Sequence, residues 1–343
     1  MTTRKLAATA FIAFSCGLMG QEGPFPVPPG RLVDLGGYRI HLNCTGRGSP
    51  TVLLSPGAGD FSFDWFLVQK KASQYARVCS YDRAGSAWSD PGPQPLTMKQ
   101  ESFEIHEALD RTGEKGPYIL VGHSLGGLVM RIFADRYPDD TAGMILVDAT
   151  SPDTTLMLNG KLVHMREMAG PGPVPDVQTM QSAPPRAPST DDLKQWSDFQ
   201  KQFGGAKIEP PFDQLPPDIQ KLQLWASSLP PRTASSDTYF AEELAQIYAQ
   251  LQKAPTPFAD KPLITIVAGR ADQKPDNLSQ KEWDSLTAEK IQQKKAYGSL
   301  SRNSKTIVDA NAEHHIQLDD PNAVIHAIQQ VQASCLNHKP LPQ

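Results

Sequence analysis

The chain has 343 residues, of which 39% are hydrophobic and 20% are charged. These are values of a globular protein and exclude a disordered or collagen-like chain. Its 33 basic and 37 acidic residues give a formal net charge of −4. The charges form no long run of one sign, so the sequence does not support a basic face for nucleic acid.

The N-terminus has the pattern of a secretory signal peptide, which we predict over residues 1–20. Arg4 and Lys5 supply the positive start, and a stretch of apolar and small residues follows over 6–20. This stretch is too short to cross a membrane as a permanent helix. We therefore expect an exported protein, periplasmic or secreted. A lipoprotein anchored through Cys16 is a weaker alternative, since the preceding residues match a lipobox poorly, and a buried first helix is another.

A proline-rich leader is predicted over residues 21–30. Short apolar segments then predict strands, and several are the continuous hydrophobic runs typical of a parallel sheet buried on both faces. The predicted strands span residues 31–35, 38–43, 51–54, 77–81, 118–121, 144–147, 263–267 and 305–309. Helical stretches such as 125–137 and 321–333 alternate with them. The pattern predicts a doubly wound α/β core built from residues 31–150 and 260–338.

The strand rhythm breaks over residues 151–259, where we predict an inserted helical lid. Prolines cluster in this segment, no strand is evident, and helix-like pieces lie between the prolines. These pieces span residues 191–202, 218–227 and 241–253. The lid would cover the carboxyl ends of the strands, where an α/β enzyme places its site. A disordered linker between two domains is the alternative, and aromatic side chains such as Trp196 and Trp225 favour a packed lid.

The segment most specific for chemistry is residues 118–127, an apolar strand followed by Gly-His-Ser-Leu-Gly and a helix. A catalytic serine stands on such a sharp strand-to-helix turn, and glycines two residues before and after it leave room for the neighbouring backbone. We therefore predict Ser124 as a nucleophile. The helix N-terminus would place the Leu125 N–H where an oxyanion forms, and His123 is expected to pack around the turn.

A serine nucleophile needs a base, and the base needs an orienting carboxylate. For a serine on this kind of turn the chain order is Ser, acid, His. His314 follows the last predicted strand and is predicted as the base, with His315 as the alternative.

The acid is predicted at Asp272, in the loop after the strand at 263–267. Asp276, a few residues further on, is the first alternative. Asp148, directly after the strand at 144–147, is the second.

A second oxyanion donor is expected after the strand at 51–54, in the sequence Ser-Pro-Gly-Ala-Gly. Small residues there let backbone N–H groups approach a ligand, and Ala58 is the predicted donor. The segment does not fit a phosphate-binding loop, because no Lys-Ser/Thr pair follows it.

With these residues placed, the chain resembles the α/β-hydrolase superfamily over roughly residues 31–335, and looks most like bacterial hydrolases of the esterase type. The matching stretches are residues 40–46, 64–65, 78–85, 88–91, 118–127 and 143–149. The resemblance implies a mixed, mostly parallel eight-stranded sheet with helices on both faces, a lid after the sixth strand, and no cofactor. It implies a supporting role for Asp82 and Arg83. A serine rather than an aspartate at the nucleophile position disfavours dehalogenase and epoxide hydrolase activity.

The resemblance also places Cys44 beside Cys79 in neighbouring antiparallel strands. A disulfide between them and separate buried thiols both remain open. None of the cysteines has metal-ligand spacing, and no metal is expected.

Together these residues predict a serine hydrolase that cleaves a carboxylic ester of a small molecule through an acyl-enzyme. Amide, lactone or thioester hydrolysis by the same residues is the nearest alternative, and a ligand-binding protein without catalysis is a further one. No nucleic acid partner and no stable membrane span are expected. The natural ester, its acyl length and the oligomeric state are left open.

Overall fold

The computed structural model describes residues 26–175, 188–202, 205–232, 239–271 and 273–342. The predicted signal peptide, Cys16 and most of the proline-rich leader lie outside these residues. The described end of the leader contacts the core, because Trp88 Nε1 donates a hydrogen bond of 2.7 Å to the Pro26 carbonyl. Within the described part of the chain, no helix is long and apolar enough to cross a membrane.

An eight-stranded sheet forms the centre of the molecule, in the order β1-β2-β4-β3-β5-β6-β9-β10. The strands are β1 Arg31–Asp34, β2 Arg39–Thr45, β3 Thr51–Ser55, β4 Val78–Tyr81, β5 Tyr118–His123, β6 Thr141–Val147, β9 Leu263–Ala268 and β10 Ser304–Asp309. Strand β2 pairs antiparallel with β1 and β4, and the remaining pairs are parallel. The predicted fold, a mostly parallel eight-stranded sheet, is confirmed.

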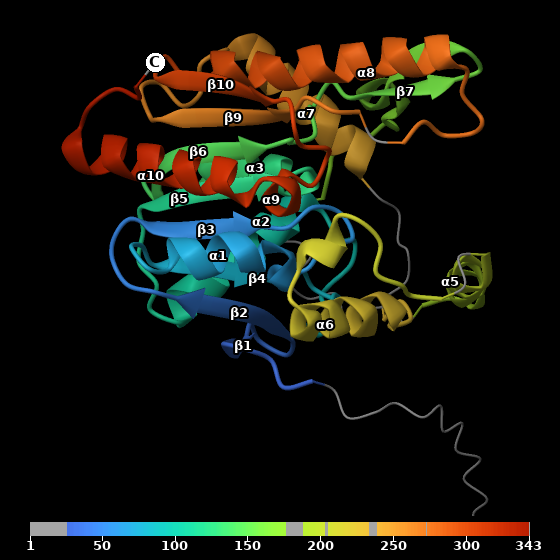
Figure 1. Ribbon diagram of the computed structural model, residues 1–343, viewed down its shortest axis with the longest axis horizontal. Helices are drawn as coiled ribbons and strands as arrows, with labels where there is room; N and C mark the ends of the chain where they lie inside the picture. The colour runs from blue at the N-terminus through green and yellow to red at the C-terminus, as the bar shows by residue number, and fades with distance from the viewer. Residues whose placement is uncertain (1–25, 176–187, 203–204, 233–238, 272, 343) are drawn as a thin grey trace, which may run out of the picture.

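Helices cover both faces of this sheet (Figure 1). They are α1 Phe66–Ala72, α2 Met98–Arg111, α3 Leu125–Arg136, α8 Gln280–Lys295, α9 Ile316–Asp319 and α10 Pro321–Asn337. Strand β5 shows why its sequence is a continuous apolar run. Leu120 packs in one core cluster with Leu128 of α3, whereas Ile119 and Val121 pack in the other with Ile328 of α10. Both faces of the strand are therefore removed from water.

The segment 151–259 holds helices, as predicted, but also a small hairpin. The helices are α5 Thr190–Gln202, α6 Pro217–Ser228 and α7 Phe240–Lys253, and the hairpin strands are β7 Thr155–Leu158 and β8 Lys161–His164. The expectation that this segment lacks strands was wrong. Asn159 and Gly160 connect the two strands with positive φ angles of 50° and 74°, the conformation that an Asn-Gly pair favours in a two-residue hairpin turn.

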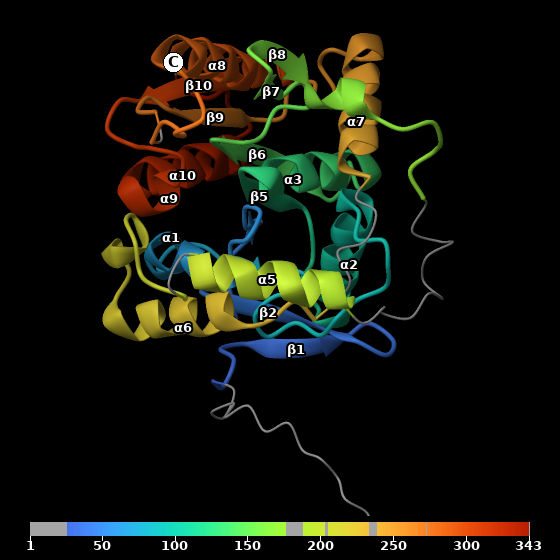
Figure 2. The same cartoon turned by 90° about the vertical axis from the view of Figure 1, so that its right-hand side faces the viewer.

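Helices α6 and α7 lie at the carboxyl ends of the parallel strands. Leu215 and Ile219 pack against Phe61 and Trp88, which belong to the loops after β3 and β4. Figure 2 faces this end of the sheet, with α5 and α6 on the side toward the viewer. The inserted segment thus borders the edge where the predicted nucleophile lies.

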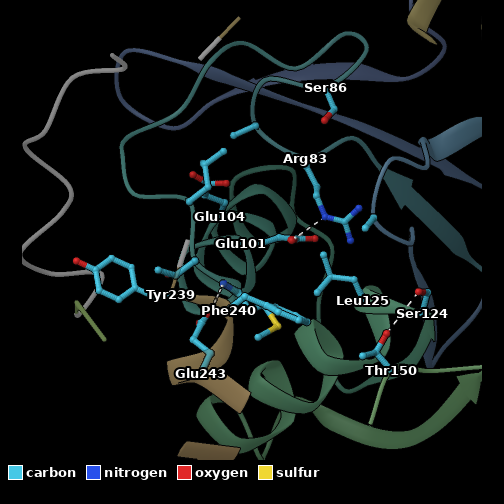
Figure 3. A pocket seen from close by; sticks show the side chains of 15 residues that line it. Arg83, Ser86, Glu101, Glu104, Ser124, Leu125, Thr150, Tyr239, Phe240 and Glu243 are labelled. Carbon is cyan, nitrogen blue, oxygen red and sulfur yellow. Dashed lines mark hydrogen bonds and ion pairs between the residues drawn. The ribbon is translucent and has the colours of Figure 1, made fainter. Parts of the chain in front are cut away.

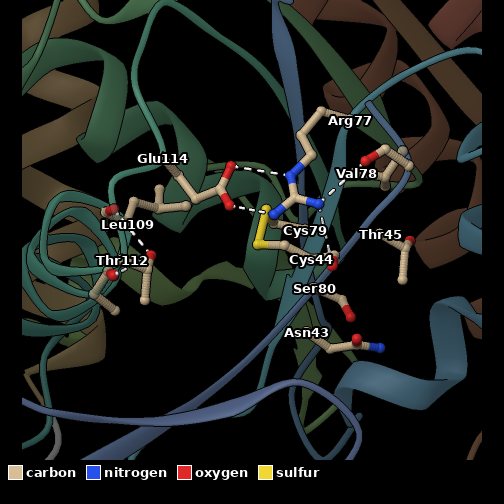
Figure 4. The surroundings of a disulfide bond; sticks show 12 residues. Asn43, Cys44, Thr45, Arg77, Val78, Cys79, Ser80, Leu109, Thr112 and Glu114 are labelled. Carbon is tan, nitrogen blue, oxygen red and sulfur yellow. Dashed lines mark hydrogen bonds and ion pairs between the residues drawn. A yellow bond between two sulfur atoms is a disulfide. The ribbon is translucent and has the colours of Figure 1, made fainter. Parts of the chain in front are cut away.

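The structure joins Cys44 of β2 to Cys79 of β4 in a disulfide (Figure 4). The two residues face each other directly in the antiparallel register. Beside them, Arg77 forms an ion pair with Glu114, so the same region carries a covalent and an ionic link. Cys335 is the free cysteine of the described chain.

We expect reduction of this disulfide, or the double substitution Cys44→Ser/Cys79→Ser, to lower the free energy of unfolding by about 2–4 kcal/mol. The bond joins residues 35 positions apart, and breaking it enlarges the conformational entropy of the unfolded chain. Urea unfolding with and without reductant measures the loss, with Cys335→Ser as the control. Two free thiols at these positions in the oxidised protein would contradict the assignment.

Candidate active site

Ser124 stands on a sharp turn between β5 and α3. Its φ and ψ angles are 50° and −121°, a strained backbone conformation for a residue with a side chain. Two glycines make the turn possible. A Cβ atom on Gly122 would lie 2.4 Å from the Gly126 carbonyl oxygen, and one on Gly126 would lie 2.5 Å from the carbonyl oxygens of Ser55 and Pro56. The sequence therefore folds into the strand-to-helix turn that was expected at this position.

His314 lies in the loop after β10 and contacts a buried carboxylate. Its Nδ1 atom is 2.6 Å from Oδ2 of Asp148, which directly follows β6. The His314 ring also lies beside the ring of His123, the residue before Ser124, with 4.6 Å between their centroids. The loop after β10 thus brings an imidazole to the nucleophile turn.

Asp148 is held in place by three groups. Its Oδ1 accepts a hydrogen bond of 3.0 Å from the Ala268 N–H at the end of β9, and its Oδ2 contacts both His314 and the ammonium group of Lys294 on α8. Burial alone would raise the pKa of Asp148. The hydrogen bond from His314 and the Lys294 charge outweigh burial and hold this pKa well below its usual range. The carboxylate is therefore an anion at neutral pH.

The sequence ranked Asp148 behind Asp272 and Asp276 as the partner of His314. Asp272 lies outside the described residues, and Asp276 is exposed in the loop before α8. The carboxylate that the structure brings to the imidazole is Asp148. The sequence signal for it was its position, because it is the first residue after a fully apolar strand at the carboxyl edge of the sheet. Lys294 was not identified, since nothing in a surface-like helix sequence indicates its contact.

The loop after β3 is fastened by Arg83. The Arg83 guanidinium donates to the carbonyl oxygens of Pro56 and Gly57, and its Nε donates to Glu101 Oε2 over 2.8 Å. In a trans peptide the C=O and N–H point in opposite directions. With the Gly57 carbonyl turned to Arg83, the Ala58 N–H points away from that side chain.

A second histidine-carboxylate cluster connects the loop after β3, the end of β5 and the loop after β10. His123 Nδ1 is 2.7 Å from Asp60 Oδ2, and His123 Nε2 is 2.9 Å from the His314 carbonyl oxygen. The Gly57 N–H donates to Asp60 Oδ2 over 3.0 Å, and His315 Nε2 is 3.3 Å from Asp60 Oδ1. Burial would raise the pKa of Asp60, but its contacts with His123 and His315 outweigh burial and hold this pKa well below its usual range.

This cluster gives His123 and His315 more definite roles than packing, and the sequence did not identify Asp60. The three side chains offer one oxygen and two nitrogen atoms within 4.8 Å of one another, a donor set that divalent metals accept. Their contacts of 2.7 and 3.3 Å are those of hydrogen bonds. The second group of this kind, Cys44, Cys79 and Glu114, has its sulfur atoms in the disulfide.

A cavity of about 510 Å³ opens beside the serine (Figure 3). Ser124, Leu125 and Ala58 all line it, so the predicted nucleophile and both predicted oxyanion donors border the same cavity. Thr150, also in the wall, has its hydroxyl 3.5 Å from Ser124 Oγ. The structure therefore brings Ser124, Ala58 and Leu125 together at a space that can admit a small molecule.

Comparisons with known proteins agree with this geometry. The model of the alpha/beta hydrolase family matches residues 52–327. Among curated proteins, one named "Probable transporter efuK" from Hormonema carpetanum is 33% identical over 132 residues, which are 36% of this chain and 19% of that protein. The chain spans well under half the length of the first curated relatives it matches.

Solved structures extend the likeness over most of the chain. A structure described as an N-acyl homoserine lactone degrading enzyme has a TM-score of 0.55 at 14% identity and covers 87% of this chain and 99% of its own. A thermophilic esterase from Thermogutta terrifontis has a TM-score of 0.52 at 19% identity, covering 89% and 97%. At such identities these structures establish the fold alone. The family match, which covers most of the chain, establishes more: this protein belongs to the alpha/beta hydrolase family.

Proposed function

We propose that the protein hydrolyses carboxylic esters through an acyl-enzyme on Ser124, with His314 as the base and Asp148 as the carboxylate that orients it. The observation that carries this proposal is the contact of 2.6 Å between His314 Nδ1 and Asp148 Oδ2, beside the strained turn at Ser124. Asp148 replaces Asp272, which the sequence favoured.

The contact between Asp148 and His314 supports the following proton movements. Asp148 is an acceptor, so His314 carries a proton on Nδ1 and a lone pair on Nε2. Nε2 removes the Ser124 hydroxyl proton while Oγ forms a bond to the ester carbonyl carbon. The same proton then passes to the alcohol oxygen as the C–O bond breaks. Water then attacks the acyl carbon while it loses a proton to Nε2. That proton passes to Ser124 Oγ as the bond between Oγ and the acyl carbon breaks, which releases the acid and restores the serine.

The oxyanion of the tetrahedral intermediate would be bound by the N–H groups of Leu125 and Ala58. Leu125 is the first residue of α3, where helix N–H groups lack intrahelical partners. The hydrogen bonds from Arg83 to the carbonyls of Pro56 and Gly57 support Ala58, because they fix the peptide that carries its N–H. Each such donor contributes on the order of 3 kcal/mol to the transition state.

The names of similar proteins support acyl transfer without selecting a substrate. They include an esterase and a lactone-degrading enzyme, and lactone or amide hydrolysis would use the same atoms. Matched ester, lactone and amide substrates, with Ser124→Ala as the background, separate these activities.

We also propose that the protein acts outside the cytoplasm. The disulfide between Cys44 and Cys79 supports this location, since such bonds persist in oxidising compartments. The predicted signal peptide supports it independently.

Asp148→Asn should lower kcat for a p-nitrophenyl ester by about 10⁴-fold, because an amide in place of the carboxylate no longer holds the imidazole in the productive tautomer. Asp272→Asn and Asp276→Asn are the matched controls and should stay within a few-fold of the wild type. Steady-state kinetics measure the effect, and thermal melts verify that each variant is folded. A large loss in Asp272→Asn with full activity in Asp148→Asn would contradict the assignment.

Asp60→Asn should lower the free energy of unfolding by about 1–3 kcal/mol at neutral pH, since it removes a charged partner of His123 and His315. The pKa of Asp60 is lowered on folding, so its ionised form adds stability above the unfolded value of about 3.9. That stability is lost as the pH falls through the folded pKa. Urea unfolding over a descending pH series should show the wild type and variant converging. A difference that stays constant into the acid range would rule out this role.

A further inference from the structure

The cavity beside Ser124 has charged residues in an otherwise apolar wall. Leu96, Met98, Leu125 and Phe240 supply apolar surface, and the charged side chains in the wall are Arg83, Glu101, Glu104 and Glu243. The wall holds three acidic side chains and one basic one. Its net charge therefore depends on which of these side chains form ion pairs with each other.

Arg83 and Glu101 form one neutral pair. Their Nε and Oε2 atoms are 2.8 Å apart, and both side chains are largely buried. The remaining guanidinium nitrogens donate to the carbonyls of Pro56 and Gly57. The Arg83 charge is thus already engaged, and the excess negative charge of the wall belongs to Glu104 and Glu243.

Glu104, on α2, is buried and its hydrogen-bond donors are uncharged. Its Oε1 accepts from the Tyr38 hydroxyl and from Gln100 Nε2, each over 2.8 Å. Burial raises the pKa of Glu104 to about 7, which reflects the cost of holding an anion in an apolar wall without a cation against it. Among the described residues it takes part in no ion pair.

Glu243, on α7, is also buried, and its hydrogen-bond donors are also uncharged. Its two carboxyl oxygens accept from the backbone N–H groups of Met98 and Lys99, over 3.0 and 3.1 Å. Burial raises the pKa of Glu243 to about 7, and the Lys99 charge and the two hydrogen bonds offset this only in part. It too lacks an ion-pair partner in the part of the chain that the structure describes. In Figure 3, Glu104 and Glu243 lie on the side of the cavity away from Ser124.

We propose that this wall binds a positive charge on the substrate, so that the ester hydrolysed at Ser124 carries an ammonium group on the part that lies against Glu104 and Glu243. This inference rests on the proposed function. A cation there would meet two buried carboxylates at low dielectric, where charges interact more strongly than in water. The ring of Phe240, in the same wall, adds a surface that cations favour. An anionic group would be repelled.

Three p-nitrophenyl esters with the same three-carbon spacer between the ester carbonyl and the end group test the charge preference. The acyl parts are γ-trimethylammoniobutyrate, its carbon isostere with a tert-butyl end, and glutarate. We expect kcat/KM for the cationic ester to exceed that of the neutral one by about tenfold, and that of the anionic one by about a hundredfold or more. Equal or reversed preference would overturn the proposal.

Glu104→Gln and Glu243→Gln remove the charge and keep the shape of the side chain. Each should reduce the cationic-to-neutral ratio of kcat/KM toward one. Glu107→Gln, on the same helix as Glu104 but outside the cavity wall, is the control and should leave the ratio unchanged. A ratio that neither cavity variant alters would also overturn the proposal.

Calorimetry separates this inference from the proposed function. The measurement uses the Ser124→Ala protein, because binding can be measured without catalysis. This protein should bind choline more tightly than it binds the uncharged alcohol in which carbon replaces nitrogen. Glu104→Gln or Glu243→Gln in that background should weaken choline binding. Cation binding without ester turnover would retain the cation site and refute the esterase. Turnover of the neutral ester without any preference for cations would retain the esterase and refute the cation site.

Discussion

The site depends on one backbone constraint, the left-handed turn at Ser124 between β5 and α3. Gly122 and Gly126 approach neighbouring carbonyl oxygens so closely that neither could carry a side chain. The turn thereby lies against the loop after β3, and Ser124 lines the same cavity as Ala58 and Leu125. The strain at this residue is sustained by the largely buried strands β3 and β6 on both sides of β5.

Around this turn, charge networks hold the remaining parts. Asp148 binds the His314 ring from the end of β6, while Asp60 binds His123, whose other nitrogen holds the His314 backbone. The loop after β10 is therefore held by Asp148 through the His314 side chain, and by Asp60 through His123, which contacts the His314 main chain. Lys294 forms an ion pair with Asp148, and Arg83 forms one with Glu101. Glu104 and Glu243 are then the acids of the cavity wall that have no ion-pair partner among the described residues.

Local sequence patterns predict the features that depend on residues close together in the chain. The apolar run before Ser124 and the glycines around it predict the turn, and the position of His314 after the last strand predicts its place at the site. The partner of His314 could not be chosen in this way, because Asp272 and Asp148 both follow strands whose carboxyl ends meet at one edge. Asp148 is held beside His314 by tertiary contacts such as its ion pair with Lys294, which no local pattern indicates. The Asn159-Gly160 pair favours a hairpin turn, but the many prolines elsewhere in the segment 151–259 favoured a lid without strands.

The central claim is that Ser124 is a nucleophile activated by the residues around it. Incubation of the folded protein with a fluorophosphonate, followed by peptide mass spectrometry, tests it most directly. We expect a single stoichiometric adduct on Ser124, because only a serine with an adjacent base attacks such phosphorus centres readily. A folded protein that forms no adduct, or forms it on another residue, would contradict the account.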